Sequence, residues 1–304
     1  MIIQNGIAVI GVDHGYGNIK TANCSFPAGV TAHQKKPYFT ENLMVYEGRY
    51  YTIGLGHKEY SNLKTSDDDY YLMTLAAIAR ELSLQKLTKA NVLIASGLPL
   101  SWVMDQQDEF KAYLLKNDEA EFNFRGTEFA VKFVGGTIYP QSFAAVADRL
   151  TEFRGVNMIA DIGNGTVNLL RIIDSRPDPT TMATEACGVK DCAVAMRLAL
   201  ANEHAGAKVD NSIIERIIRK GAADVDAGYL KTMTQAARVY TESLFRRMRE
   251  AGYDPKTMRL HVLGGGSCLI RNFGEYDPAR VTFNNDIHAN AKGYEHLALA
   301  GLKR

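Results

Sequence analysis

The chain has 304 residues, of which 46% are hydrophobic and 23% charged, so it can bury a large core and is not expected to be disordered. Its 35 Lys and Arg against 34 Asp and Glu give a formal net charge of +1, which excludes an overall electrostatic attraction to nucleic acid or to an anionic membrane. The four cysteines include no C-x-x-C pair, and no apolar run approaches the roughly 18 residues that cross a bilayer, so we expect a cytoplasmic protein of about two domains with reduced thiols.

The first half of the chain mixes the two-residue period of strands with the three-to-four-residue period of helices. The chain opens with an apolar run that ends in an acid, followed by a tight turn and a second apolar run, and this pattern indicates a hairpin. A second hairpin is expected to turn at Glu47 and Gly48. A helix that begins at Asp68 or Asp69 would bury one apolar face. The expected strands are 7–12, 19–24, 43–46, 50–53, 92–96, 122–124 and 129–134, and the other expected helices are 104–115 and 142–153.

The second half opens like the first, with an apolar strand that ends in an acid, followed by a glycine turn and a second strand. A helix-rich stretch follows, and its last helix carries apolar residues at three-to-four spacing, which indicates packing in the core rather than a cofactor site. The expected strands are 158–161, 167–173 and 260–263, and the expected helices are the stretch 191–250, broken near 205–206 and 221–228, and 291–302.

The turns after these two acids form an internal repeat. Asp13-His14-Gly15-Tyr16-Gly17 and Asp161-Ile162-Gly163-Asn164-Gly165 both read Asp-x-Gly-x-Gly between two strands, and they lie 148 residues apart. At average residue usage, about 0.1 such pattern is expected per chain. Each copy alone is a weak signal, whereas two copies in the same setting indicate a duplicated binding element.

The glycines and aspartates of the repeated turns suit the binding of a phosphate chain. Glycine lets a tight turn bring backbone N–H groups against an anion with no Cβ in the way. An aspartate beside phosphates repels them unless a divalent cation lies between, so the two acids predict Mg²⁺ with several waters. Lys20 lies on the strand after the first turn and is either a phosphate contact or a surface lysine. Gly264-Gly265-Gly266 follows a buried strand and would let an adenine and ribose lie against the backbone, or simply begins a helix.

Two common nucleotide sites are excluded. A Rossmann site needs a third glycine three residues after the second, where this chain has Lys20, and then a helix, where the chain continues as a strand. No G-x-x-x-x-G-K-[ST] motif of a P-loop occurs.

The order of these motifs resembles that of the actin, heat-shock chaperone and sugar-kinase ATPase superfamily, with its first and second phosphate motifs and its adenosine motif. The segments 139–145 and 289–294 fall where that superfamily places its interdomain connectors, and Gly97-Leu98-Pro99 after a buried strand is similar to the signature of ParM/StbA-type plasmid-segregation actins. The resemblance implies an α/β, two-domain actin-like fold, each domain built on a ribonuclease-H-like mixed sheet flanked by helices, with the nucleotide in the interdomain cleft. The implied domains are 1–145, completed by the helix 290–304, and 146–289 with the adenosine motif.

The resemblance also implies roles for particular residues. Asp13 and Asp161 would hold Mg²⁺ through water and, with Gln141, carry the catalysis. The adenosine would lie on Gly264, Gly265 and Gly266. The residues implied around the phosphates are Gly15, Tyr16, Gly17, Asn18, Lys20, Gly163, Asn164, Gly165 and Thr166.

The chain departs from the family pattern at two of these positions. Gln141 stands where ParM relatives carry a glutamate. A glutamine can orient a water but cannot accept its proton, so the base would be Asp13 or Asp161 acting through water, or the phosphate itself, and hydrolysis should be slow. Tyr16 stands where actins prefer a small hydroxyl residue, and His14 is either a packing or a functional residue.

The function implied by the resemblance is an ATP-driven filament that segregates plasmid DNA and is destabilised by hydrolysis of the ATP, with Mg²⁺ as the metal and GTP as the alternative nucleotide. Its expected partners are further copies of the chain and a DNA-binding adaptor, with no direct sequence-specific DNA binding and no membrane. Residues 216–249 hold eight Lys and Arg against three Asp and Glu, which indicates either a filament or partner face or a solvated helix surface. The alternatives are a small-molecule kinase for a sugar or an acyl group, and a nucleotide-dependent scaffold that does not polymerise.

Overall fold

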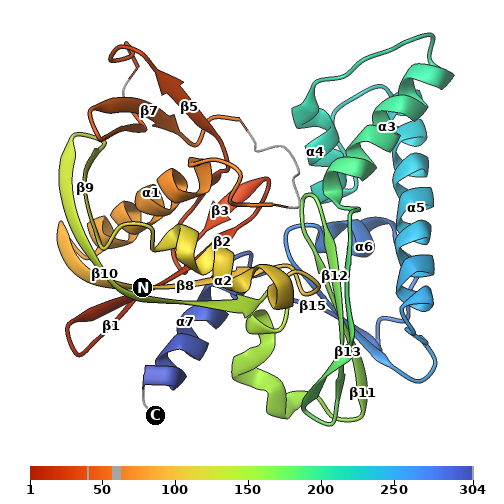
Figure 1. Cartoon of the computed structure of the whole chain (residues 1–304). Helices are drawn as coiled ribbons and strands as arrows, with labels where there is room; N and C mark the ends of the chain where they lie inside the picture. The colour runs from red at the N-terminus through yellow and green to blue at the C-terminus, as the bar shows by residue number, and fades with distance from the viewer. Residues whose placement is uncertain (40, 57–62, 303–304) are drawn as a thin grey trace. The chain divides into compact units, whose positions relative to one another are not determined.

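The structure is a computed structural model that describes residues 1–39, 41–56 and 63–302. The chain divides into two units. Unit 1 comprises Met1–Arg149 and His288–Arg304, and unit 2 comprises Leu150–Ile287. Each unit contains its own mixed sheet and its own hydrophobic core, so the fold is of the expected mixed α/β class (Figure 1).

Unit 1 is built on a ten-stranded sheet in the order β4-β3-β2-β8-β10-β9-β6-β7-β5, with β1 paired to β2. The strands β2, β8 and β10 run parallel, whereas β3 and β4 continue the sheet from β2 in antiparallel pairs. The strands are β1 (Ile2–Gln4), β2 (Ile7–His14), β3 (Asn18–Lys20), β4 (Ser25–Pro27), β5 (Val30–His33), β6 (Leu43–Tyr46), β7 (Arg49–Ile53), β8 (Lys89–Leu98), β9 (Glu119–Phe124) and β10 (Thr127–Pro140).

The helices of unit 1 are α1 (Asp69–Leu84), α2 (Val103–Leu114) and α7 (Ala289–Leu302). Helix α1 buries more than the one face expected, because it contacts β2, β3, β5, β7 and α2. The expected helix at 142–153 is wrong in type: the segment forms the 3₁₀ helix η1 (Ala144–Glu152), and Arg149 has the non-helical angles φ −128° and ψ 23°. A 3₁₀ helix is seldom continued beyond three or four residues, which accounts for this interruption.

Helix α7 packs against the strand β2 and against the start of η1, and at both places backbone meets backbone. A Cβ at Gly11 of β2 would overlap the carbonyl oxygen of Ala291, and a Cβ at Gly293 would overlap that of Ala144. The Gly11 N–H donates to Glu295 Oε1 at 3.0 Å. Glycine is therefore required at both positions for the helix to lie this close.

Unit 2 has a five-stranded sheet in the order β13-β12-β11-β14-β15. The strand β13 was not among the expected strands, and it contains Pro177 and Pro179, which a strand in the interior of a sheet does not tolerate. It lies at the edge, where proline is tolerated. The elements are β11 (Val156–Ile162), β12 (Val167–Ile173), β13 (Arg176–Glu185), β14 (Arg259–Leu263), β15 (Val281–Phe283), α3 (Val189–Glu203), α4 (Asn211–Lys220), α5 (Ala227–Glu250) and α6 (Ser267–Phe273).

The five strands of the unit 2 sheet have the same topology as five strands of the unit 1 sheet. In the order β4-β3-β2-β8-β10 and in the order β13-β12-β11-β14-β15, the first two pairs are antiparallel and the last two are parallel. Each unit therefore contains a mixed sheet, as expected. The strands β2 and β11 occupy equivalent central positions, and each ends at the repeated Asp-x-Gly-x-Gly turn.

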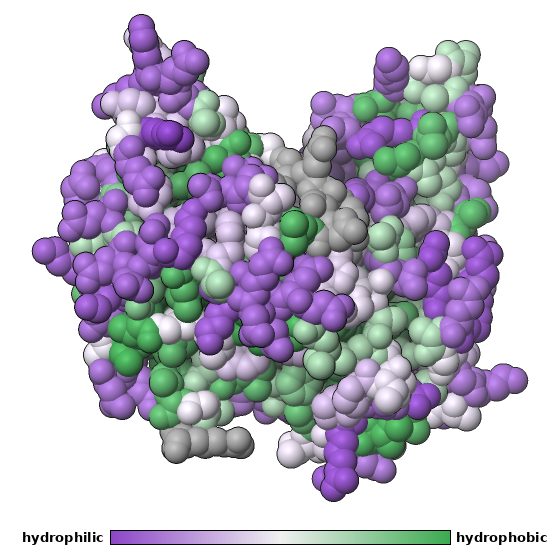
Figure 2. Space-filling model, in the orientation of Figure 1, coloured by the Kyte–Doolittle hydropathy of each residue, from purple (hydrophilic) through white to green (hydrophobic). Residues whose placement is uncertain are grey.

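The apolar stripe of α5 lies in the core of unit 2, as expected: Met233, Ala237, Leu244 and Met248 are buried. The face of the molecule in Figure 2 is largely hydrophilic, with its hydrophobic residues in separate groups. Within residues 1–39, 41–56 and 63–302, no helix combines the length and the apolar character that a bilayer crossing requires.

The close approach of α7 gives a stability prediction. Gly293→Ala is expected to lower the free energy of unfolding by about 2 to 3 kcal/mol, because the added methyl group must push the helix away from Ala144. Gly301→Ala in the same helix meets nothing within 4 Å and should leave stability unchanged or slightly raised. Urea unfolding of the two variants measures this difference, and equal unfolding midpoints would contradict the packing argument.

Candidate functional site

The first repeated turn connects β2 to β3 in unit 1. Asp13 and Lys20 are directly paired across this hairpin, and the Gly15 N–H donates to the Asp13 carbonyl at 3.1 Å. A Cβ at Gly15 would lie 2.7 Å from the carbonyl oxygen of Asn18, which is closer than a real side chain permits. The turn therefore needs glycine at this position and leaves its backbone uncovered by a side chain there.

Asp13 is buried at the end of β2, with 3% of its surface exposed. Lys20 Nζ donates to Oδ2 at 3.1 Å, and Gln141 Nε2 donates to Oδ1 at 3.1 Å. Because a carboxylate only accepts hydrogen bonds, the NH₂ group of Gln141 must face Asp13, and its Oε1 remains the acceptor of that side chain. The structure thus brings together three of the predicted site residues.

Gln141 is held in place by its backbone. Its N–H donates to the Leu98 carbonyl at 2.8 Å, directly after the end of β10. The next residue, Ser142, has a φ of +67°, and its N–H donates to Asn290 Oδ1 at 2.9 Å. The two predicted connector segments, 139–145 and 289–294, therefore meet inside unit 1.

His14 is a packing residue. Its ring is fully buried, with Nδ1 2.9 Å from Ser96 Oγ and Nε2 2.7 Å from Thr74 Oγ1. Burial, and secondarily the positive charge of Lys64, hold the pKa of His14 well below its ordinary value. A neutral, doubly hydrogen-bonded imidazole in the core has no direct part in the chemistry of the turn.

Lys64 lies beside the first turn and was not among the predicted site residues. Only 2% of it is exposed, and Nζ donates to the His14 carbonyl at 2.5 Å. The ammonium lies 5.6 to 6.0 Å from the ring centres of Tyr16, Tyr70 and Phe110. Burial lowers the pKa of Lys64 to about 8. No motif or spacing in the sequence distinguishes this lysine from a surface lysine.

The second repeated turn connects β11 to β12 in unit 2. Asp161 is buried, with 5% of its surface exposed, and is paired with Asn168 across the hairpin. The Gly163 N–H donates to the Thr166 carbonyl at 2.8 Å and closes the turn. The structure therefore gives Asp161 the same strand-end position in its sheet that Asp13 has in unit 1.

The start of α3 supports the second turn from behind. The N–H groups of Val189 and Lys190 donate to the carbonyls of Gly163 and Asn164 at 3.1 and 3.0 Å. A Cβ at Gly188 would overlap the Asn164 carbonyl oxygen. Gly188 was not among the predicted site residues, since its importance lies in this packing and not in a motif.

The triple glycine follows β14 and lies against the second turn. Leu263 pairs with Asp161 in the sheet, so the glycines begin beside that carboxylate. Gly264 has a φ of +79°, and a Cβ there would overlap Asp161 Oδ1. At Gly265, by contrast, a Cβ would meet nothing within 4 Å. The predicted adenosine motif and the second phosphate motif are thus neighbours in unit 2, and Gly265 is open to a ligand.

The acids fit a hydrated Mg²⁺ better than a metal caged by protein. Among the residues that the structure describes, no group of three or more His, Cys, Asp or Glu side chains is placed to hold a metal ion. Mg²⁺ usually keeps several waters and needs only one or two carboxylates together with substrate phosphates. Asp13 accepts two hydrogen bonds and has capacity for about two more, so metal-bound water can donate to it.

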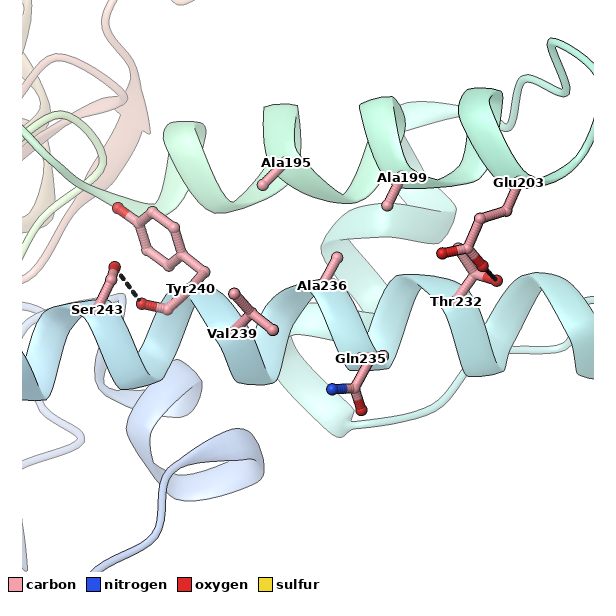
Figure 3. Close-up of a pocket in the computed structure, with 9 residues that line it drawn as sticks. All are labelled: Ala195, Ala199, Glu203, Thr232, Gln235, Ala236, Val239, Tyr240 and Ser243. Carbon is pink, nitrogen blue, oxygen red and sulfur yellow. Dashed lines mark hydrogen bonds between the residues drawn. The ribbon is translucent and has the colours of Figure 1, made fainter.

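A separate groove of about 380 Å³ lies between α3 and α5 (Figure 3). Tyr240 lies at one end, where its hydroxyl donates to the Gly188 carbonyl at 2.8 Å, and Glu203 lies at the other end and accepts from Thr232 at 2.7 Å. No Lys or Arg is among its lining residues, so this groove is unsuited to phosphates. The residues that line it are Ala195, Ala199, Glu203, Thr232, Gln235, Ala236, Val239, Tyr240 and Ser243.

Comparisons with known proteins support the fold. Residues 11–143 match the family model described as actin like proteins N terminal domain. No curated protein matches the chain. Among solved structures, the archaeal actin homolog Ta0583 in complex with ADP is 19% identical, with a TM-score of 0.73 over 96% of this chain and 99% of that one.

Two ParM structures are similar over nearly the whole chain. The ParM of a 15-stranded filament from Clostridium botulinum is 16% identical, with a TM-score of 0.73 over 96% of this chain and 99% of that one. Bacillus thuringiensis ParM with ATP is 11% identical, with a TM-score of 0.70 over 99% and 100%. At these identities the similarity shows the fold, and the fold is that of the actin-like proteins.

The buried His14 gives a pH prediction. Its folded pKa lies below the unfolded value of about 6.5, so below pH 6.5 the unfolded chain binds the proton more readily. This residue therefore lowers the free energy of unfolding as the pH falls from 6.5, by at most about 1.4 kcal/mol per pH unit. His14→Gln should remove this contribution. Urea unfolding between pH 5 and pH 7.5 measures the slope, and a variant with the wild-type slope would contradict the assignment.

Proposed function

We propose that this chain, which has the actin-like fold, binds a purine nucleoside triphosphate with Mg²⁺, hydrolyses it slowly and assembles into filaments. The observation that carries the proposal is the duplicated turn. Among the five strands that the two sheets have in common, β2 and β11 each end at a buried aspartate and an adjacent glycine turn. Glycine turns with an acid nearby suit a metal-bound phosphate chain.

In this proposal the nucleotide is held by both repeats. Backbone N–H groups of the two turns bind the phosphates, apart from those of Gly15 and Gly163, which already donate to the carbonyls of Asp13 and Thr166, and Lys20 is a further cation. Asp13 and Asp161 hold Mg²⁺ through water, and the metal supplies charge neutralisation for the phosphates. The open backbone at Gly265, beside Gly264 and Gly266, receives the adenosine. This assignment is supported by two similar structures, one of Ta0583 in complex with ADP and one of Bacillus thuringiensis ParM with ATP.

Gln141 is proposed to orient the attacking water. Its amide NH₂ is fixed on Asp13, so its Oε1 can accept a hydrogen from a water but cannot remove the proton. The proton then passes to an aspartate through water or to the phosphate itself. This arrangement lacks a strong base, which supports slow turnover.

Self-association is proposed by analogy with the Clostridium botulinum ParM, whose described structure is a filament. We further propose that the filament moves plasmid DNA through a DNA-binding adaptor, since a net charge of +1 gives no general attraction to DNA. The eight basic residues of 216–249 are exposed, and among them Arg247 pairs with Glu185 at 2.9 Å. This exposed basic surface on α4 and α5 is a candidate contact for that partner.

Sedimentation and right-angle light scattering test the proposal. With Mg²⁺ and ATP or GTP the pure protein should scatter light and pellet, and without nucleotide it should do neither. Nucleotide binding without assembly would instead indicate a small-molecule kinase or a scaffold on the same fold.

Asp161→Ala should lower the rate of nucleotide hydrolysis at least about 100-fold, since it removes a group that positions the metal and its water. Asp224→Ala provides the matched control, because Asp224 is an exposed acid of the same unit. Phosphate release, measured at saturating Mg²⁺ and nucleotide, gives the rates. Undiminished turnover in the Asp161 variant would remove that residue from the mechanism.

Gln141→Ala should slow phosphate release while leaving nucleotide-dependent assembly intact, because it removes the water-orienting amide but neither of the two aspartates. Gln141→Glu keeps a similar size and adds a weak base, but it also places a second carboxylate beside Asp13. Phosphate release and sedimentation on the same samples separate chemistry from assembly. An alanine variant that hydrolyses at the parent rate refutes the role of Gln141.

A further inference from the structure

The peptide unit between Gln141 and Ser142 is held at both of its polar groups. The Gln141 carbonyl accepts a hydrogen bond from the Phe143 N–H at 2.7 Å, and the Ser142 N–H donates to Asn290 Oδ1 at 2.9 Å. A rotation of this peptide unit would break both bonds. Its orientation therefore depends on Asn290, which belongs to α7, as well as on the residues that follow β10.

The turn that these residues form is strained. Ser142 has a φ of +67°, and the bond from Phe143 to Gln141 closes a three-residue γ-turn around it. A γ-turn whose central residue is left-handed is rare, and a residue other than glycine keeps this conformation only where the surrounding contacts impose it. Ser142 is fully buried, so bulk water cannot replace the acceptor of its N–H. The bond to Asn290 is therefore one of the contacts that hold the turn in this conformation.

Asn290 extends from a helix that lies very close to the sheet of unit 1. Directly after it, the Ala291 carbonyl is so near to β2 that a Cβ at Gly11 would overlap it. One turn further along α7, the Tyr294 hydroxyl leaves no space for a Cβ at Gly97 of β8. The close fit at both places limits the movement of α7, so the Asn290 side chain has the rigid support that a positioning group needs.

These contacts fix the direction in which the Gln141 side chain points. The Gln141 N–H is bonded to the Leu98 carbonyl at 2.8 Å, so the peptide units on both sides of the Gln141 Cα are held. The two planar peptide units set φ and ψ of Gln141, and with them the direction of its Cα–Cβ bond. From this direction its amide reaches Asp13 Oδ1 at 3.1 Å. The peptide unit before Gln141 is thus held by β8, and the one after it by α7.

We propose that Asn290 is a positioning residue for nucleotide hydrolysis, which acts through the strained turn at Ser142 and holds the amide of Gln141 on Asp13. This inference rests on the proposed function and adds to it a residue that the repeated motifs do not contain. The effect of Asn290 on the reaction passes entirely through Gln141. The competing explanation is that Asn290 only fastens the start of α7 to the segment after β10.

Phosphate release at varied nucleotide concentration and saturating Mg²⁺ tests the proposal. Asn290→Ala should lower kcat by about 10-fold to 100-fold, because a misplacement of about 1 Å in a positioning contact can cost about 100-fold, and it should leave KM unchanged. Asn290→Asp retains an acceptor oxygen for the Ser142 N–H and should recover most of the lost kcat. An unchanged kcat in Asn290→Ala, or the same loss in both variants, overturns the inference.

Asn123→Ala is the matched control. Asn123 Oδ1 likewise accepts from the backbone N–H of a residue with a positive φ, in this case Gly126 with +84°, at 3.0 Å. This bond lies in the hairpin between β9 and β10, so the variant loses the same kind of contact without altering the turn at Ser142. Its kcat should equal that of the wild type. An equal loss of kcat in Asn123→Ala would show that kcat follows general stability, and would overturn the inference.

A double-mutant cycle separates positioning from fastening. If Asn290 acts through Gln141, the double variant Gln141→Ala/Asn290→Ala should hydrolyse nucleotide at the rate of Gln141→Ala alone, because no amide is left to position. If Asn290 only fastens α7, Asn290→Ala unfolds at a lower urea concentration but keeps the wild-type kcat per folded molecule. That result, or a further loss of kcat in the double variant, overturns the inference.

Failure of the proposed function gives a different pattern. A wild-type protein that binds no nucleotide overturns that function itself. A Gln141→Ala variant that hydrolyses at the parent rate removes Gln141 from the mechanism, and the inference fails with it. An unchanged kcat in Asn290→Ala beside a slowed Gln141→Ala variant overturns the inference alone.

Discussion

The buried carboxylate of Asp13 is the interaction on which the candidate site of unit 1 depends. A charge with 3% exposure is stable only if its oxygens are satisfied, and the two groups that satisfy them come from different parts of the chain. Lys20 lies on β3 and Gln141 follows β10. The need to satisfy one carboxylate therefore fixes the first hairpin and the connector after β10 to each other. The hydrogen bonds to Asp13 are therefore needed for the stability of unit 1 as well as for the proposed binding of a nucleotide.

Much of the fold could be predicted because the sequence carries its own repetition. Strand patterns at 7–12 and 158–161 are each followed by the same turn, and glycine is needed in those turns for a local steric reason that a sequence displays directly. The strand β12 and the breaks between α3, α4 and α5 also lie where the apolar period and the glycines indicate. The grouping of Asp13, Lys20 and Gln141 was implied by the resemblance to the actin, heat-shock chaperone and sugar-kinase superfamily. In the structure, the side chains of Lys20 and Gln141 both donate to Asp13.

The remainder could not be predicted because it depends on contacts between distant segments. Nothing near Lys64 in the sequence shows that its ammonium lies under the first turn, and Gly188 matters only because Asn164 passes behind it. The 3₁₀ helix η1 has a composition that suits an ordinary helix, and β13 contains prolines that a central strand would exclude. In each case packing outweighed the local preference.

The place of α7 has a consequence for how the protein is made. Unit 2 is continuous from Leu150 to Ile287, whereas unit 1 needs residues 288–302 to cover β2 and the backbone at Ala144. On the ribosome the first 149 residues therefore emerge long before the helix that completes their core. Closing so long a loop is slow, so unit 2 is expected to reach its native packing while the earlier-synthesised unit still exposes part of its sheet. A chaperone that shields that sheet would act during this interval.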